Sequence, residues 1–514
     1  MVAPLRTLGL LGLLATTASA QDIELEKKHT RWRFTFEDVD LPGTDDLGVV
    51  GVHYDVLNPL PEFPPLYVGL GGYAGVSGEE QGSFLVGGTL GTIWHPAPLR
   101  SIDAGLFLGA GSDAGGRPTD GWATRPFVAV ERVFGLYGVR FEVALLDMDE
   151  FERDWTFGIG FTLPSEVLSG REREMPRAIP SNFLVQRKVR ITPRWLGLDP
   201  DGGTRSRVGD TLSRDVSMMG IGIDYFLTPH VFVPLEAYGA TGGGLAGFVA
   251  AGAGLGGSWP LGNSGASLET KAVLLSGGGG AVDTGGGLGW QAMIGLRSPV
   301  VGPLALEVLA GRTDFFDGDF GADTLSVGLT WTSRPLELGI TYPRGNLDRA
   351  GLSDSDAQLD PLRVTVATKA LVPRSDARTK SGEEHEPVLS LLGFGVEKPV
   401  HENLALTARA FAAFDGGVGG YSEGFLGARA ELEPTDWERL RVSASFEAGA
   451  AGGGNVDVGS GLVFHSAAGL AIDLTRSTFV QLEWGKTEAS DGTFEAEAIT
   501  LSLGWTLQRP VLRD

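Results

Sequence analysis

The stretch Ile499-Thr500-Leu501-Ser502-Leu503-Gly504-Trp505-Thr506-Leu507 alternates between two kinds of side chain. Successive side chains of an extended strand point to opposite faces, so the apolar residues share one face and the Thr, Ser and Gly residues share the other. Two earlier stretches, Trp155–Thr162 and Leu325–Thr332, show the same pattern and also finish on an aromatic residue and a threonine. The alternation predicts a β-strand with one apolar face, used three times.

Two further segments recur in the same order around this strand. Gly278–Leu288 returns as Gly452–Leu462, while Met219–Asp224 returns as Leu392–Glu397 and, more faintly, as Val50–Asp55. Three landmarks that keep one order predict three copies of one unit. The predicted organisation is a signal peptide at 1–20, β-barrel repeats at 21–165, 182–334 and 362–514, and linkers at 166–181 and 335–361.

The start of the chain and its composition limit the possible classes of protein. Arg6, an apolar core from Leu8 to Leu14 and the small-residue site Ala18-Ser19-Ala20 are typical of a secretory signal peptide. The absence of cysteine from 514 residues excludes disulfides, thiolate metal sites and cysteine catalysis. A net charge of −23 argues against a nucleic-acid partner.

The spacing of the strands points to a membrane. Each copy divides into about eight strands of roughly 8–12 residues, the length that a tilted strand needs to cross a bilayer. Short connections such as Leu227–His230 alternate with longer, acidic, glycine-rich ones such as Thr313–Thr324. Soluble β-sandwiches share the alternation of faces but do not predict this alternation of turns and loops. We therefore predict an all-β protein, a transmembrane antiparallel up-and-down β-barrel of about 24 strands.

Two segments fit this scheme less simply. Ala237–Leu268 carries no charge and could pass for a membrane helix, but its glycines and Pro260 favour two strands and a turn. Leu336–Tyr342 is strand-like and has no partner in the strand count.

The strand at Ile499–Leu507 resembles the terminal recognition strand of Gram-negative outer-membrane β-barrel proteins, which alternates apolar residues and finishes on an aromatic one. It departs from that pattern because the chain continues past Thr506 to Asp514. The resemblance extends over the mature chain at the level of class and identifies no subfamily. It implies a location in the bacterial outer membrane, contact with lipid and lipopolysaccharide, and insertion by the outer-membrane assembly machinery.

Two ways of closing the barrel remain open, three tandem eight-stranded barrels or one 24-stranded barrel. The long, charged, proline-bearing linkers favour three barrels. Charges also recur on the polar faces of two strands, the first and the seventh of each copy, which only the eighth strand separates. In a packed lumen these charges can pair. They are Arg31, Arg33, Lys188, Arg190, Arg363 and Lys369 in the first strands and Glu142, Glu307 and Glu483 in the seventh.

Motifs for chemistry are weak. Gly252–Gly257 fits a dinucleotide fingerprint and Gly420–Gly424 a nucleophile elbow, but neither leads into a helix. We therefore expect no enzyme and no organic cofactor. The best candidate site is an acidic loop that suits Ca²⁺ or Mg²⁺, although a solvated loop is the simpler interpretation. Its carboxylates are Asp314, Asp317, Asp319 and Asp323, with counterparts at Asp147, Asp149, Glu150 and Asp154.

Two functions are compatible with these features. Three packed barrels favour a non-enzymatic, structural protein of the cell envelope that presents surface loops, because eight strands leave no aqueous channel. The alternative is a passive, porin-like channel for small solutes, which requires all the strands to close as one wide barrel. The sequence identifies no protein partner.

Overall fold

The computed structural model describes most of the chain that follows the predicted signal peptide, and residues 1–20 themselves lie outside the described residues. The described ranges are 23–39, 47–57, 66–78, 83–112, 120–135, 137–148, 153–172, 184–206, 209, 211–212, 215–338, 349–352, 357–385, 388–434 and 439–512.

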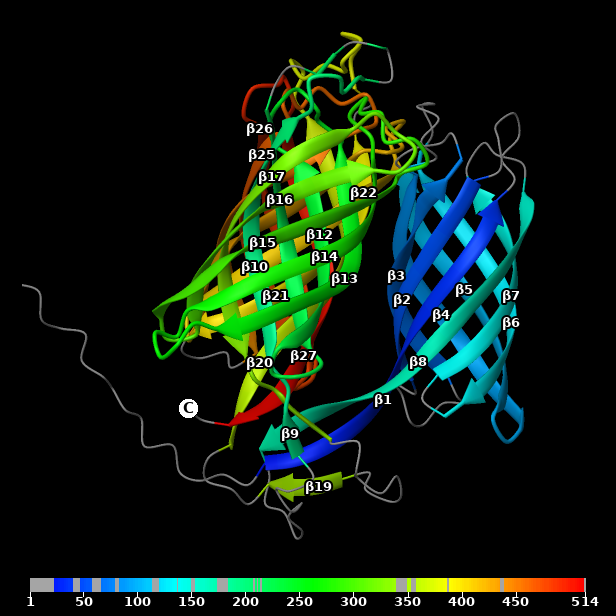
Figure 1. The fold of residues 1–514 in the computed structure, drawn as a ribbon, viewed down its shortest axis with the longest axis vertical. Helices are drawn as coiled ribbons and strands as arrows, with labels where there is room; N and C mark the ends of the chain where they lie inside the picture. The colour runs from blue at the N-terminus through cyan, green and yellow to red at the C-terminus, as the bar shows by residue number, and fades with distance from the viewer. Residues whose placement is uncertain are drawn as a thin grey trace, which may run out of the picture.

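The strands form three closed barrels, each with eight antiparallel strands that follow one another in chain order (Figure 1). The first barrel consists of β1(Ile23–Val39), β2(Leu47–Leu57), β3(Leu66–Ser77), β4(Phe84–Ala97), β5(Arg100–Ser112), β6(Trp122–Phe134), β7(Tyr137–Met148) and β8(Asp154–Glu172). The second consists of β10(Val189–Pro200), β11(Val216–Phe226), β12(Val231–Ala240), β13(Val249–Pro260), β14(Ser267–Gly278), β15(Leu288–Val301), β16(Leu304–Phe315) and β17(Gly321–Ser333). The third consists of β20(Ala357–Pro373), β21(Leu389–His401), β22(Leu404–Asp415), β23(Ser422–Leu432), β24(Leu440–Gly452), β25(Leu462–Asp473), β26(Thr478–Ala489) and β27(Glu495–Leu512).

Each barrel closes where its first strand pairs with its eighth. These pairs are β1 with β8, β10 with β17, and β20 with β27. The prediction of an antiparallel up-and-down barrel in three eight-stranded units is confirmed. The alternative of one 24-stranded barrel is wrong, because each repeat satisfies its own edge strands and leaves none to pair with the next repeat. Among the described residues no helix is long and apolar enough to cross a membrane.

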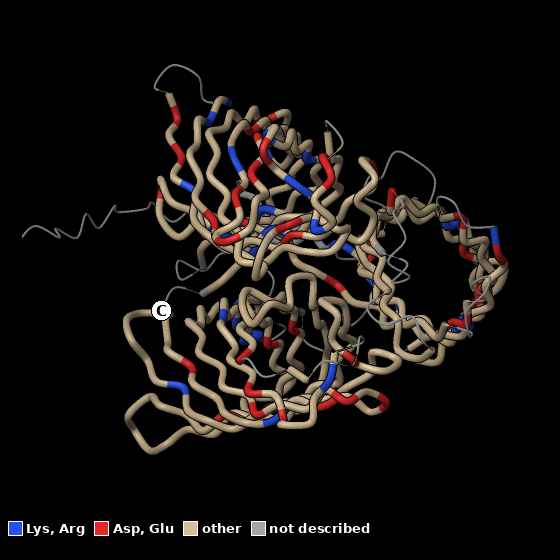
Figure 2. Tube along the Cα trace, turned by 90° about the horizontal axis from the view of Figure 1, so that it is seen from above, with Lys and Arg blue, Asp and Glu red and all other residues tan. Residues whose placement is uncertain are grey.

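The two faces of the strands lie as the alternation predicts. In β27 the apolar Ile499, Leu501 and Leu503 point outward and are exposed, while Thr500 and Ser502 point inward and are buried. Seen from above in Figure 2, the first barrel is a ring, and the other two barrels stand beside it. An apolar exterior over a polar interior is the reverse of a soluble barrel and is the arrangement that a lipid environment requires.

Two short strands beside the second barrel account for the unpartnered segment. β18(Leu336–Leu338) pairs with β9(Leu184–Gln186). Leu336–Tyr342 therefore begins with a strand, and its partner is the short strand that precedes the second barrel in the chain. Ala237–Leu268 contains more than two strands and a turn. It includes the end of β12, a loop, all of β13, a turn and the start of β14.

β8 runs past the predicted end of its repeat at 165, and β20 begins ahead of the predicted start of its repeat at 362. β8 continues to Glu172, and β1 pairs with it from Ile23 onward. β27 continues to Leu512, paired with β20 from Ala357. A further strand, β19(Arg349–Leu352), pairs with the start of β1. We call the end of the molecule where β9 and β19 lie the linker end, and the opposite end, with the long connections, the loop end (Figure 1).

Candidate functional site: the charged interiors and their lids

The half of the first barrel nearer the linker end contains a buried network of ion pairs. Arg31 donates from Nε to Asp55 at 2.7 Å and from Nη2 to Asp103 at 2.7 Å. Arg33 donates from Nε to the same Asp55 oxygen at 2.6 Å, and Arg140 donates to Asp103 at 2.5 Å. All five side chains are buried. Because removing a charge from water is costly, such groups are tolerated only when opposite charges and hydrogen bonds surround them.

Nearer the loop end of the same lumen, Arg125 bridges two carboxylates, and Arg140 also donates to one of them, Glu142, at 2.8 Å. Arg125 on β6 donates to Glu37 on β1 at 2.7 Å and to Glu142 on β7 at 2.6 Å. The predicted pairing of a first-strand cation with Glu142 is therefore not formed in this barrel. Arg125 of the sixth strand instead bridges Glu142 to Glu37 of the first strand.

In the second barrel a lysine lies at the centre of the network. The Nζ atom of Lys271 lies 3.1 Å from Asp224, 3.3 Å from Glu236 and 3.4 Å from Glu307. Arg194 completes the cluster with contacts of 2.8 Å to Glu236 and 3.0 Å to Glu307. Two cations thus share three carboxylates, and all five side chains are buried.

The lower end of the second lumen holds two of the predicted charges. Arg190 lies 3.0 Å from Glu269 and 3.9 Å from Glu307, so a first-strand cation approaches the seventh-strand Glu307 directly in this barrel. Lys188 is only partly buried, and its Nζ lies 4.2 Å from the centre of the Phe226 ring. A cation at this distance from an aromatic face gains a modest electrostatic attraction.

The third barrel repeats the principle with different partners. Arg409 on β22 donates to Glu447 at 3.0 Å and to Glu483 at 2.6 Å. Arg429 on β23 donates to Glu483 at 2.7 Å and also to Glu397. The predicted first-strand charges pair elsewhere. Lys369 contacts Glu423 at 2.5 Å and Arg363 contacts Glu431 at 2.6 Å. Glu483 is thus bridged from the third and fourth strands.

All nine predicted lumen charges lie in barrel interiors, but sequence reasoning missed most of their partners. One signal was available. The landmark segments Val50–Asp55, Met219–Asp224 and Leu392–Glu397 each end on an acid, and these three acids are buried and ion-paired in their own barrels. The remaining missed partners stand singly on polar strand faces. They include Asp103, Arg125, Arg140, Arg194, Glu236, Lys271, Arg409, Arg429 and Glu447.

An apolar layer closes the second barrel above its ion pairs at the loop end. Phe248, Phe315 and Phe320 pack with ring centres 5.5 to 6.4 Å apart. Val282, from the repeated glycine-rich segment, is buried in the same cluster. The backbone N–H of Phe320 donates to the carbonyl of Asp283 at 3.1 Å, which ties two loops together. We call this apolar cluster and its loops the lid.

The third barrel has an equivalent lid. Val456 and Val458 pack with Tyr421 and Phe494, and the N–H of Phe494 donates to the carbonyl of Asp457 at 3.1 Å. The recurrence of Gly278–Leu288 as Gly452–Leu462 therefore has a structural cause. Both segments fold inward over a lumen as the central piece of a lid.

The shape of this segment explains its glycines. Ala281 and Asn455, at equivalent positions, both have φ of 59°, and glycines with positive φ precede and follow them. This left-handed conformation costs other residues about 1–2 kcal/mol, so a chain that turns this often needs glycine. The high glycine content is in part the requirement of the lids.

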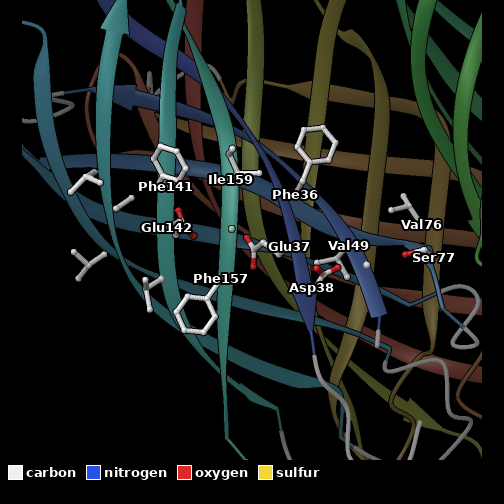
Figure 3. Close-up of a pocket in the computed structure, with 16 residues that line it drawn as sticks. Phe36, Glu37, Asp38, Val49, Val76, Ser77, Phe141, Glu142, Phe157 and Ile159 are labelled. Carbon is white, nitrogen blue, oxygen red and sulfur yellow. The ribbon is translucent and has the colours of Figure 1, made fainter. Parts of the chain in front are cut away.

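A small cavity lies inside the first barrel and a larger hollow lies against its wall. A cavity of about 40 Å³ lies under its loop end, lined by Glu37, Tyr73, Arg125 and Thr156 among others. A larger open hollow, of about 840 Å³, involves the barrel wall (Figure 3). The strand register places it between two rows of outward side chains, with Phe36 and Ile159 in one row and Phe157 in the other. This hollow is a groove on the apolar exterior and not a passage through the lumen.

The predicted metal loop does not gather its carboxylates. Among the described residues, no three histidine or acidic side chains lie close enough to hold a metal ion. Arg312 lies among the acids instead, 3.1 Å from Asp314 and 2.5 Å from Asp201. Its hydrogen bond lowers the pKa of the Asp201 carboxyl. The geometry therefore gives the predicted site no support. Of the predicted counterparts, Asp147 pairs with Arg153 at 2.8 Å, and Asp149 and Glu150 lie outside the described residues.

Comparisons with known proteins show no family for the chain. No protein-family model matches it, and no curated protein matches its sequence. A search of solved structures finds outer-membrane β-barrels of Pseudomonas aeruginosa. OpdL is 10% identical over 94% of this chain and 99% of its own, with a TM-score of 0.22. OpdK with vanillate is 8% identical over 95% and 98%, with a TM-score of 0.24.

The ferric enterobactin receptor PfeA, also from Pseudomonas aeruginosa, is 8% identical over 93% of this chain and 81% of its own, with a TM-score of 0.28. These neighbours are outer-membrane β-barrel proteins, and at scores this low their likeness carries no argument about this chain.

Proposed function

We propose that this chain is an integral protein of the bacterial outer membrane with a structural, non-enzymatic role, in which three packed barrels hold a common set of surface loops. The observation that carries the proposal is the filling of the lumens. Buried ion pairs occupy each interior, and apolar lids lie over those of the second and third barrels. An eight-stranded barrel has an interior just wide enough for its own side chains, and here those side chains are fixed to one another.

Transport through these barrels would require large rearrangements. A solute entering the second barrel would have to displace the buried Phe248 and Phe320 and then separate Lys271 from three carboxylates. Breaking buried ion pairs costs several kcal/mol each. The channel alternative depended on a single wide barrel, and three closed barrels remove that basis.

The apolar exterior supports the location. Outward side chains such as Phe157, Leu274 and Trp484 are each about 60% exposed or more and would be a liability in water. In the proposed setting they contact lipid, and lipopolysaccharide surrounds the loop end. Insertion by the outer-membrane assembly machinery follows from the same location, and the cleaved signal peptide at 1–20 would provide export.

The test is the conductance of the full mature chain in a planar lipid bilayer. We expect no steady current steps from protein whose folding has been verified by strand content and by its heat-dependent mobility in gels. Steps that scale with salt concentration and persist in folded protein would contradict the proposal and favour a channel. A variant without residues 279–286 separates the contribution of the lid from that of the ion pairs. This variant lacks part of the lid of the second barrel but keeps its ion pairs, and its second barrel should still conduct no ions.

A further inference from the structure

One type of contact recurs between the barrels. The third strand of the first barrel, β3, contacts the fifth strand of the second, β14. The third strand of the second barrel, β12, contacts the fifth strand of the third barrel, β24. The third strand of the third barrel, β22, contacts the fifth strand of the first, β5. One contact type, made head to tail three times, returns to its starting point, which is the condition for a closed ring.

The contacting segments are equivalent in detail. In each barrel a residue near the tip of the third strand donates a backbone hydrogen bond to the residue eight positions later in the chain. The three N–H donors are Gly75, Ala240 and Ala413, and their carbonyl acceptors are Ser83, Phe248 and Tyr421. After the fifth strand the spacing is ten positions in each case, from Gly111 to Gly121, from Gly277 to Gly287 and from Ala451 to Gly461.

A glycine of positive φ lies at each interface. Gly121, Gly287 and Gly461 have φ of 83°, 86° and 101°. A Cβ atom on Gly121 would lie 2.6 Å from the carbonyl oxygen of Ala413, and one on Gly461 would lie 2.4 Å from that of Ala240. At Gly287 the corresponding distance, to the carbonyl of Gly75, is 3.1 Å. These glycines let the third-strand tip of the neighbouring barrel approach closely.

Specific contacts surround each glycine. Between the first and second barrels, the Ser276 hydroxyl donates to the carbonyl of Gly75 at 2.7 Å. Between the third and first, the N–H of Gly420 donates to the carbonyl of Gly111 at 3.1 Å, and Trp122 packs against Phe414.

Between the second and third barrels, Ala246 is buried in the apolar cluster of the third lid. The loop of one barrel therefore contributes to the core of its neighbour.

The linker end is joined by a second equivalent set. The ends of β8 and β27, the eighth strands of the first and third repeats, lie here together with β18, which follows the eighth strand of the second repeat. These three strands contact one another pairwise. Leu168, Leu336 and Val511, one from each repeat, are buried there. Both ends of the molecule thus bring all three repeats together.

We infer that each repeat carries two complementary docking surfaces, the tip of its third strand and the glycine turn after its fifth, and that the partner of each surface is another copy of the same repeat. The chain closes on itself as a three-membered ring in the membrane. Every such surface is used within the chain, so the ring has no open end to which another chain can add.

The test uses the absence of cysteine. A Cβ on Gly239 would lie 2.7 Å from the Cβ of Ala450, about 1 Å closer than the Cβ atoms of a disulfide. A small outward shift between β12 and β24 should therefore let the double variant Gly239→Cys and Ala450→Cys form a disulfide across the second interface in the full chain. Adding Gly461→Val, which places a branched side chain against Ala240, should slow its formation in lipid vesicles by about tenfold or more. Gly382→Val is the matched control, because Gly382 has φ of 87° and no neighbouring atom within 4 Å of its Cβ position.

Three results would overturn the inference. They are no disulfide in the parent double variant, equal rates with and without Gly461→Val, and equal slowing by Gly382→Val. Ala246→Asp guards against misfolding of the third barrel, because it perturbs the same interface from the second barrel. It should slow the disulfide similarly while the third barrel keeps its folded mobility. These outcomes do not depend on whether the barrels conduct, so failure here is distinguishable from failure of the proposed function.

Discussion

Replacing Lys271 by methionine is expected to destabilise the second barrel by about 3–5 kcal/mol, the usual cost of leaving a buried charge without its partner. Lys271 and Asp224 are both inaccessible to solvent. Among the described residues Asp224 forms no other ion pair, and its Oδ2 atom has no hydrogen-bond partner. Methionine keeps the volume of the lysine stem, so the loss reports the charge and not a cavity. Urea unfolding of protein in lipid vesicles measures it.

A compensating change separates this electrostatic effect from a packing effect. Adding Asp224→Asn to Lys271→Met removes the orphaned charge and should restore part of the lost stability. Lys486→Met is the control, since Lys486 is exposed and pairs with Glu488 and Glu495 on the surface, where ion pairs contribute about 0–1 kcal/mol. If Lys271→Met were no more harmful than Lys486→Met, the lumen would be wet and the packed-barrel proposal would lose its support.

The fold could be predicted because its decisive signals are local. Alternation in Ile499–Leu507 depends only on the two-residue period of a strand, and the recurrence of Gly278–Leu288 depends only on comparison of the chain with itself. The choice between one barrel and three required more, because pairing β1 with β8 or with a later repeat leaves the same pattern in every strand.

The lumen partners were beyond the sequence for a different reason. Which strand face points inward is a local property, so Arg190 and Glu307 were found. Which charges meet depends on the stagger of strands around the barrel and on the reach of each side chain. No pattern in the sequence distinguishes Lys271 in β14, yet the stagger of the strands brings it to Asp224 on β11, three strands away.

The contacts between barrels leave the weakest signal in the sequence. Gly121, Gly287 and Gly461 hold equivalent places, but the segment that leads to Gly121 shares little with the other two beyond its length. The backbone hydrogen bonds that define the equivalence need no particular side chain. The glycine itself was visible, but its partner, a backbone carbonyl of another repeat, has no residue identity to recognise.

Replacing Phe320 by alanine is the second change with a large expected effect, a loss of about 3–5 kcal/mol in the stability of the second barrel. Phe320 is fully buried and packs against Phe248 and Phe315. It lies in a loop whose acidic, glycine-rich sequence would predict exposure to solvent. Removing the ring leaves a void that the glycine-rich backbone around it can fill only by giving up its tie to Asp283. Thermal unfolding followed by gel mobility measures the loss.

Phe316→Ala is the matched control, four residues away on the same loop but 57% exposed, and it should change stability by less than about 0.5 kcal/mol. The contrast decides what the loops are. If Phe320→Ala is as harmless as Phe316→Ala, the lids are surface decoration and could open to admit a solute. If only Phe320→Ala is costly, the lid is a second core stacked on the ion pairs. The loops that it presents outside are then held as rigidly as the barrel wall, as a structural platform requires.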